Sequence, residues 1–128
     1  MSRIVLDASA LLALLNGESG AEKLTPQLLH AATSSTVNLA EVQSKLVSRG
    51  IDPDDAWKAT LSPSREAAVF TDEHAKIAGS LVAETSGLGL SLGDRACLAL
   101  GIALKAPVYT ADRVWENLKL GIRIHVVR

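Results

Sequence analysis

The sequence has one cysteine, few aromatic side chains and no histidine cluster. The single Cys97 excludes an internal disulfide and any zinc site built from several cysteines. The three histidines, His30, His74 and His125, show no paired ligand spacing, so a zinc site is not expected. Only 3% of the chain is aromatic whereas 48% is apolar. The core is therefore built from Leu, Ala, Val and Ile, which suits helices packed on a parallel sheet.

The chain also lacks a large net charge and a long hydrophobic run. Its 13 basic and 14 acidic residues give a net charge of −1, which argues against attachment to nucleic acid by bulk charge but is compatible with a local basic patch. No apolar run reaches the ~18 residues of a membrane span. The first residues lead directly into Asp7 rather than into a signal peptide. We expect a soluble cytoplasmic protein without a membrane partner.

Short apolar or β-branched runs alternate with helical segments along one predicted domain, residues 1–128. That length is enough to bury a core of its own. The patterns predict strands at residues 3–7, 32–37, 66–70, 107–110 and 122–127. They predict intervening helices at residues 8–15, 19–30, 38–49 and 52–61, with longer ones from 71 and from 91. This alternation predicts an α/β fold with a parallel sheet and right-handed crossovers.

Four acidic residues stand where predicted strands end or the following helices begin: Asp7, Glu41, Asp94 and Asp112. In a parallel sheet these positions share the carboxyl edge, where ligands collect. Two carboxylates about 5 Å apart repel by roughly 3 kcal/mol at an effective dielectric constant near 20. A hard divalent cation, by contrast, requires oxygen ligands of this kind. The four acids together therefore favour a metal site that supports hydrolysis at phosphate.

Each acid taken alone also has a structural explanation, because acidic residues favour helix starts. Asp7 and Asp112 can cap the helices that follow them, and two acids stand three residues after a capping residue, in the pairs Asn38–Glu41 and Ser91–Asp94. Capping needs only Ser, Thr or Asn, so it does not explain why all four positions are acidic.

Three other polar residues lie beside the acids in sequence. Ser9 and Thr110 are candidates to position a water or a phosphate oxygen, although turn hydroxyls that bond the local backbone explain them equally well. Arg95 follows Asp94 and is a candidate to grip a substrate phosphate, with solvated surface charge as the alternative. Cys97, Trp57 and Trp115 are expected to pack among apolar neighbours.

Four segments resemble a known family. They are residues 4–15 (IVLDASALLALL), 37–42 (VNLAEV), 90–100 (LSLGDRACLAL) and 108–115 (VYTADRVW), and the last two are the most specific. Through them the chain resembles the PIN-domain ribonucleases, and within these the VapC toxins of bacterial toxin–antitoxin pairs. The resemblance covers essentially the whole chain, although nothing carries over for residues 50–65.

The resemblance implies a three-layer α/β sandwich with a central five-stranded parallel sheet. It implies a Mg²⁺ or Mn²⁺ site made by all four acids, and endonucleolytic cleavage of RNA, often structured RNA such as tRNA or rRNA. It further implies the toxin role in a type II toxin–antitoxin system, a cognate antitoxin that blocks the site, and a homodimer.

Three alternatives fit the residues less well than this interpretation. A phosphoacceptor receiver domain needs adjacent acids after its first strand, where Asp7 stands alone, and Asp72 is a poor substitute for its acceptor. A phosphatase of the Asp-x-Asp type needs an acid where Ser9 stands. A non-catalytic RNA- or protein-binding module does not explain four acids, since carboxylates without a metal repel RNA. Thermal stabilisation by divalent cations would discriminate this last class.

Overall fold

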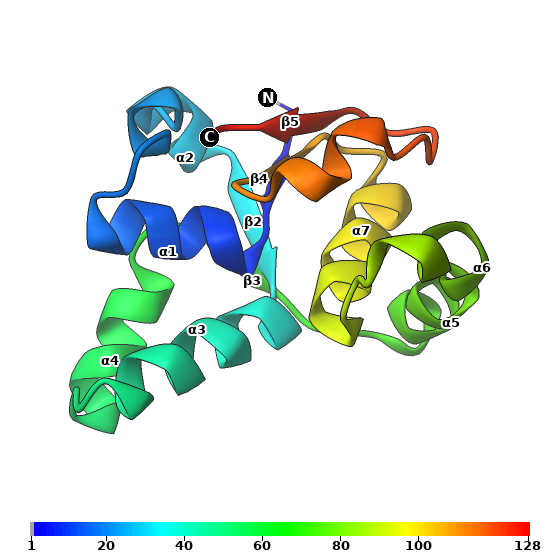
Figure 1. Cartoon of the computed structure of the whole chain (residues 1–128). Coiled ribbons are helices and arrows are strands. Elements are labelled where there is room, and N and C mark those ends of the chain that lie inside the picture. Colours follow the sequence, from blue (N-terminus) through cyan, green and yellow to red (C-terminus); the bar gives the residue numbers. More distant parts are fainter. Residues whose placement is uncertain (1) are drawn as a thin grey trace.

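A five-stranded, fully parallel sheet forms the centre of the protein in a computed structural model that describes residues 2–128 (Figure 1). The strands are β1 (Ile4–Leu6), β2 (Ala32–Ser35), β3 (Glu66–Ala68), β4 (Val108–Thr110) and β5 (Ile124–Val126). Their order in the sheet is β3-β2-β1-β4-β5, so β1 is central, with Val5 in register with Thr33 of β2 and Val108 of β4. The predicted α/β fold and its five parallel strands are confirmed.

Helices connect the strands and cover both faces of the sheet. The α-helices are α1 (Ala8–Asn16), α2 (Pro26–His30), α3 (Thr36–Ser48), α4 (Pro53–Leu61), α5 (Asp72–Ser80), α6 (Val82–Thr85) and α7 (Leu92–Leu104). Three 3₁₀ helices add single turns: η1 (Ala21–Lys23), η2 (Ser86–Leu88) and η3 (Arg113–Asn117). No helix within residues 2–128 combines the length and the hydropathy needed to cross a membrane.

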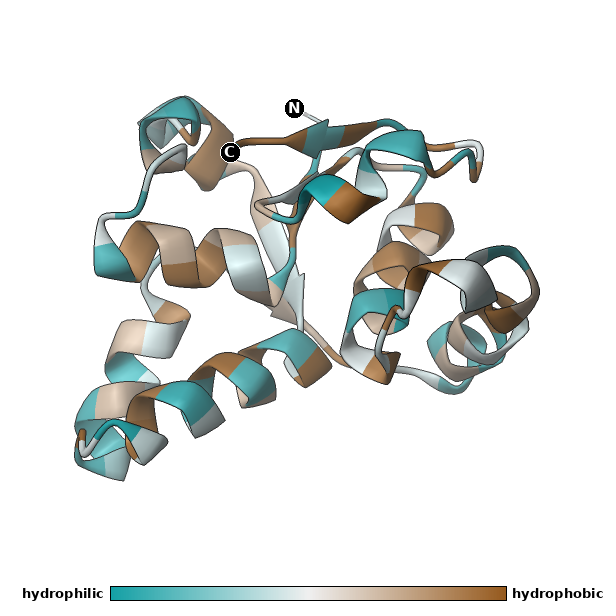
Figure 2. Cartoon of the chain, in the orientation of Figure 1, coloured by the Kyte–Doolittle hydropathy of each residue, from teal (hydrophilic) through white to brown (hydrophobic). Residues whose placement is uncertain are grey.

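Two hydrophobic clusters, one on each face of the sheet, complete the predicted three-layer sandwich. Ile4 and Leu6 point to the side of α1 and α3, whereas Val5 points to the side of α7, as the alternation of a strand requires. Figure 2 shows long hydrophobic stretches in α1 and α7, while hydrophobic and hydrophilic residues alternate in α3. Trp115 is fully buried and packs as expected, but the prediction is wrong for Trp57, which is 41% exposed on α4.

The helix predicted at residues 19–30 is wrong, because the chain forms η1 and then α2 instead. Pro26 lacks an N–H group and fits the first turn of a helix, where Thr25 caps α2. Gly20 has a φ of 96°, and a Cβ there would lie 2.2 Å from the carbonyl oxygen of Val127. This close approach to the C-terminal segment fixes a turn at Gly20, which a continuous helix could not make.

Two further boundaries differ from the prediction. The second strand ends at Ser35, whose hydroxyl accepts from the Val37 N–H and caps α3, so Asn38 lies inside the helix rather than at its cap. The helix predicted from residue 71 starts with its Thr71 cap as expected but divides at Leu81 into α5 and α6. The Thr85 hydroxyl donates to the Leu81 carbonyl, a contact of the kind that bends helices.

Candidate active site

Asp7 stands at the carboxyl end of the central strand β1 and caps α1. Its Oδ1 accepts from the Ala10 N–H at 2.8 Å, and the side chain is only 3% exposed. The Ser9 hydroxyl lies 2.8 Å from Oδ1 and 2.9 Å from Oδ2, and the Thr110 hydroxyl donates to Oδ2 at 2.5 Å. The carboxylate is therefore fixed in one orientation by groups from α1 and from the end of β4.

The hydroxyls of Ser9 and Thr110 each serve here as a hydrogen-bond donor and as an acceptor. The Ser9 oxygen accepts from the Ala111 N–H at 2.9 Å, and the Thr110 oxygen accepts from the Asp112 N–H at 3.0 Å. Their protons point to Asp7, so the two residues orient that carboxylate and tie the ends of β1 and β4 together. The role in positioning a water or a phosphate oxygen stays a prediction for both.

Burial raises the pKa of Asp7 to about 6. The hydrogen bonds from Thr110, Ala10 and Ser9 oppose this effect, and the negative charge of Asp94 adds to it. Removing a carboxylate from water is costly unless an opposite charge compensates it. The ionised form of Asp7 is thus destabilised by burial and by the charge of a second carboxylate. A bound cation would stabilise it.

Glu41 reaches the same region from α3 and lies against the first turn of α7. Its Oε1 accepts from the Asn38 amide at 2.8 Å, and the same amide donates to the Gly93 carbonyl at 3.0 Å. A Cβ at Gly93 would lie 2.2 Å from Glu41 Oε2, so the absence of a side chain at this position makes room for the carboxylate. Glu41 is therefore placed beside Asp94, the residue that follows Gly93.

Asn38 and Gly93 were not predicted as site residues. The prediction of Asn38 as a helix cap is wrong, because α3 begins two residues before it and is capped by Ser35. The available signals were an amide one helical turn before an acid and a glycine directly before another acid. Neither signal indicates a contact between positions 38 and 93 until α3 and α7 are placed side by side.

Asp94 and Asp112 both cap the helical turns that they begin. Asp94 and Ser91 form the predicted capping box, in which Asp94 Oδ2 accepts from the Ser91 N–H at 2.9 Å. Asp112 Oδ1 accepts from the Val114 N–H at 2.9 Å at the start of η3. Capping thus occupies one oxygen of each carboxylate, and no hydrogen bond from residues 2–128 occupies the other. The capping explanation is correct for both residues and leaves an oxygen of each for a ligand.

Three of the four acids act on one buried point, the thiol of Cys97. Burial raises the pKa of this thiol well above its usual value, and the charges of Asp7, Asp94 and Glu41 add to the effect in that order. Cys97 lies on α7 about one turn after Asp94 and is fully buried, as expected for a core residue. The structure therefore brings Asp7, Glu41 and Asp94 together from three different elements. The Asp112 N–H donates to the Thr110 hydroxyl, which fixes the backbone of this fourth acid next to a partner of Asp7.

The donor set fits a hard cation held partly through water. Within the described residues 2–128, no three Asp, Glu, His or Cys side chains form a preassembled metal cage. Mg²⁺ does not need one, because it keeps several waters and is commonly bound by one or two carboxylates. The nearby groups are oxygen donors, and Asn38 Oδ1 is a buried acceptor without a protein partner in this part of the chain. These ligands suit Mg²⁺ or Mn²⁺ better than zinc.

Arg95 directly follows Asp94 in the first turn of α7. Its Nη1 donates to the Ala78 carbonyl at 2.9 Å, so the half-buried side chain links α7 to α5. This contact uses one of the five guanidinium N–H groups. Phosphate binding by Arg95 therefore stays a prediction.

A parallel α/β sheet with acids gathered at its carboxyl edge defines the class of this protein. The sequence model of the PIN domain matches residues 4–120. Because this match spans most of the chain, the protein belongs to the PIN domain family. No curated protein matches the sequence.

Solved structures share the fold over nearly the whole chain. VapBC2 from Rickettsia felis, bound to a promoter DNA fragment, has a TM-score of 0.73 at 20% identity and covers 98% of each chain. DNA-bound VapBC from Salmonella typhimurium has a TM-score of 0.76 at 17% identity and covers 100% of each. VapC20 from Mycobacterium tuberculosis, a Sarcin-Ricin loop cleaving toxin, has a TM-score of 0.72 at 18% identity and covers 94% of this chain and 98% of that one.

Proposed function

We propose that this protein is a Mg²⁺- or Mn²⁺-dependent endoribonuclease and the toxin of a type II toxin–antitoxin system. Membership of the PIN domain family supports a nuclease, and the similarity to chains from VapBC structures supports the toxin role. The observation that carries the proposal is the fixed, buried carboxylate of Asp7, together with the contact that holds the Glu41 carboxylate against Gly93, directly before Asp94.

The four acids have distinct roles in this proposal. Asp7 is the rigid ligand, because Ser9 and Thr110 hold both of its oxygens in place. Glu41 is oriented by Asn38, and Asp94 and Asp112 each offer the oxygen that capping does not use. When bound, the cation would polarise the phosphodiester and lower the pKa of an attacking water.

The acids also explain why RNA would approach the site only with a cation. The four carboxylates repel phosphate, so RNA bound at this edge needs compensating positive charge. Glu41 and Asp94 face the substrate side from α3 and α7, while burial keeps Asp7 out of contact with solvent. Which phosphodiester of the RNA is hydrolysed then depends on where these carboxylates hold the cation.

The proposed partners are an RNA substrate, a cognate antitoxin and a second copy of the chain. The relative that cleaves the Sarcin-Ricin loop supports a structured RNA such as tRNA or rRNA as the substrate. The VapBC relatives support a cognate antitoxin as a partner, and its binding over the acidic edge is proposed from the family resemblance. A homodimer is proposed from the family resemblance.

Sequencing of RNA ends after induced expression tests this proposal, with Asp94→Asn as the matched variant. Asparagine keeps an oxygen that can accept from the Ser91 N–H, so the cap of α7 is preserved while the charge is removed. New RNA ends should appear at defined positions with the wild type and be absent with Asp94→Asn. Wild-type cleavage by the variant would contradict the site assignment.

Thermal melting separates the nuclease from a non-catalytic binding module. Millimolar Mg²⁺ or Mn²⁺ should raise the melting temperature of the wild type, since a ligand that binds only the native state stabilises it. The shift should be smaller for Asp94→Asn. If there is neither a shift nor a new RNA end, the binding module is the better interpretation.

A further inference from the structure

Basic residues stand at the amino end of every strand, on the edge of the sheet opposite the acids. Arg3, Arg65 and Arg123 directly precede β1, β3 and β5, while His30 and Lys105 stand two and three residues before β2 and β4. In sheet order they form a row, Arg65–His30–Arg3–Lys105–Arg123, which we name the basic edge. All five residues are solvent-exposed.

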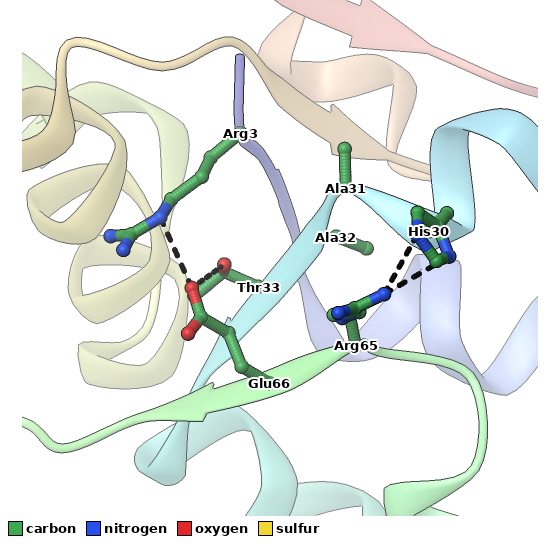
Figure 3. A pocket seen from close by; sticks show the side chains of 7 residues that line it. All are labelled: Arg3, His30, Ala31, Ala32, Thr33, Arg65 and Glu66. Carbon is green, nitrogen blue, oxygen red and sulfur yellow. Dashed lines mark hydrogen bonds and ion pairs between the residues drawn. The ribbon is translucent and has the colours of Figure 1, made fainter. Parts of the chain in front are cut away.

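One hollow of about 380 Å³ opens between the first three members of this row (Figure 3). Arg65 Nη1 lies 2.7 and 3.2 Å from the two ring nitrogens of His30, on one side of the hollow. On the other side Arg3 Nε pairs with Glu66 Oε1 at 3.1 Å, and the Thr33 hydroxyl donates to the same oxygen. Glu66 therefore compensates Arg3, whereas no carboxylate within residues 2–128 pairs with Arg65.

A second hollow, of about 620 Å³, lies at the other end of the row. Lys105 and Arg123 line it together with Ser2, Pro107 and Gly121 and with four apolar residues, Ile102, Ala106, Leu120 and Ile122. Neither cation forms a salt bridge with a residue in the described chain. The basic edge thus carries four permanent cations and one carboxylate, although the protein as a whole has a net charge of −1.

We propose that the basic edge binds the phosphate backbone of RNA, away from the site of cleavage. Neighbouring strands lie about 4.8 Å apart, so five strands span roughly 19 Å. An A-form or B-form duplex of that length carries on the order of ten phosphates, and guanidinium groups bind phosphate with two parallel hydrogen bonds. The choice of RNA as the polyanion rests on the proposed function.

The composition of this edge favours a nucleic-acid backbone over an acidic peptide. Peptide-binding surfaces commonly add exposed apolar anchor sites to their charged groups. The large exposed apolar side chains within residues 2–128 lie on helices, in the loop after α3 or at the carboxyl side of the sheet: Val47, Ile51, Trp57, Leu61, Val69, Val82, Leu88, Leu92 and Val114. The apolar residues that line the second hollow are buried or half-buried. Beside its three basic residues, the first hollow is lined by Ala31, Ala32, Thr33 and Glu66, so a ligand there is held by charge and hydrogen bonds, as a phosphate backbone is.

The two edges of the sheet face opposite ways, which assigns them to different parts of one RNA. Each strand has three or four residues. At about 3.3 Å per residue this separates the edges by roughly 10–13 Å before the loops are added. No single phosphate can contact both edges. The basic edge is thus a secondary surface for a region of a folded RNA distant from the cut.

Equilibrium binding tests this inference without any requirement for cleavage. The probe is a fluorescein-labelled RNA hairpin, and every protein carries Asp94→Asn so that the probe remains intact. Adding Arg65→Ala and Arg123→Ala should weaken binding at least ~10-fold at about 50 mM salt and reduce the slope of log K against log salt by about 1.4–1.8, the value for two lost phosphate contacts. The charge-retaining pair Arg65→Lys and Arg123→Lys should recover most of the slope.

The matched control removes two exposed cations that lie away from the basic edge, Lys58 on α4 and Lys76 on α5. Lys58→Ala with Lys76→Ala should change the affinity less than twofold. Equal losses in both pairs, or no loss in either, would overturn the proposal. Binding that falls for polyglutamate but not for RNA in the arginine pair would also overturn it, in favour of an acidic peptide.

The outcome is independent of catalysis. If the wild type cleaves no RNA while the arginine pair still loses binding, the proposed function fails and the basic edge stands. If the wild type cleaves RNA and the arginine pair binds the hairpin normally, the basic edge fails alone. Thermal melts of each variant show that a loss of binding does not come from unfolding.

Discussion

The carboxylate of Glu41 occupies the space that a side chain at position 93 would need. A Cβ on Gly93 would lie 2.2 to 2.4 Å from three atoms of that carboxylate group. The same pair is joined through Asn38, whose amide donates to Glu41 and to the Gly93 carbonyl. The start of α7 and the carboxylate from α3 are therefore fitted to each other, and this fit sets the position of one acid relative to Asp94.

Gly93→Ala should displace Glu41 and lower RNA cleavage at least ~10-fold, because a misplaced ligand weakens the cation site. The fold should persist, since the atoms in the way belong to the end of a long side chain. The measurements are the cleavage rate and the Mg²⁺-induced rise in melting temperature, and both should fall together.

Gly79→Ala is the matched control for that change. Gly79 also lies in a helix, but nothing stands within 4 Å of a Cβ built there. Alanine is favoured over glycine in a helix by up to about 1 kcal/mol, so this variant should melt slightly higher and cleave normally. Equal cleavage by the two alanine variants would contradict the role given to Gly93.

Asp7→Asn should stabilise the protein at pH 7.5 in the presence of EDTA. Because folding raises the pKa of Asp7 from 3.8 to about 6, the folded state holds this proton more tightly than the unfolded chain. The stability contributed by protonation is complete below pH 3.8 and is lost as the pH rises through about 6. Ionised Asp7 therefore costs about 3 kcal/mol at pH 7.5.

Asparagine at position 7 avoids that cost and keeps an acceptor for the Ala10 N–H. The gain in the free energy of unfolding should reach at most about 3 kcal/mol at pH 7.5 and shrink toward pH 4. Urea denaturation at the two pH values measures it. A variant that is less stable than the wild type at pH 7.5, or a gain independent of pH, would show that burial does not dominate at Asp7.

Thr110→Val should impair both stability and cleavage, whereas Thr110→Ser should restore them. Valine keeps the shape but removes the nearer of the two donors to Asp7 Oδ2 and leaves the Asp112 N–H without an acceptor. Leaving buried polar groups without partners costs about 1–3 kcal/mol. Calorimetry with and without Mn²⁺ separates a loss of packing from a loss of metal binding. Valine should also reduce the rise in melting temperature that Mn²⁺ causes. A full Mn²⁺ shift in Thr110→Val would show that this hydroxyl does not position Asp7.

The thiol of Cys97 should not react with alkylating reagents in the native protein, although it lies on α7 one turn after Asp94. It is fully buried, and burial together with three nearby carboxylates raises its pKa well above the usual value, so little thiolate forms. Iodoacetamide should label Cys97 only after addition of denaturant, as mass spectrometry would show, and should leave cleavage unchanged. Rapid labelling of the folded protein would contradict the burial.

The sequence predicted the parts of the fold that depend on local patterns. The apolar runs around Val5 and Val108 predict buried strands, and the Ser91–Asp94 spacing predicts a cap that the structure contains. The predicted acids lie at the carboxyl edge because a parallel sheet places every such strand end on the same side.

Contacts between distant parts of the chain account for what the sequence did not predict. Gly20 turns the chain because Val127, at the other end of the sequence, lies against its backbone. The contact between Asn38 and Gly93 joins residues 55 positions apart. Local patterns do not contain such pairs, so the division of residues 19–30 and the support of Glu41 could only be found in three dimensions.

The hydrogen bonds of Thr110 with Asp7 and Asp112 have a consequence for synthesis of the chain on the ribosome, which runs from the N-terminus to the C-terminus. Asp7 is synthesised before its partner Thr110, which stands 103 positions later in the sequence. At 5–20 residues per second, the ribosome needs roughly 5–20 s to make the intervening chain. The nascent polypeptide cannot orient Asp7 during that interval. In a toxin, this delay would withhold catalytic competence until the segment that carries Thr110 has been translated.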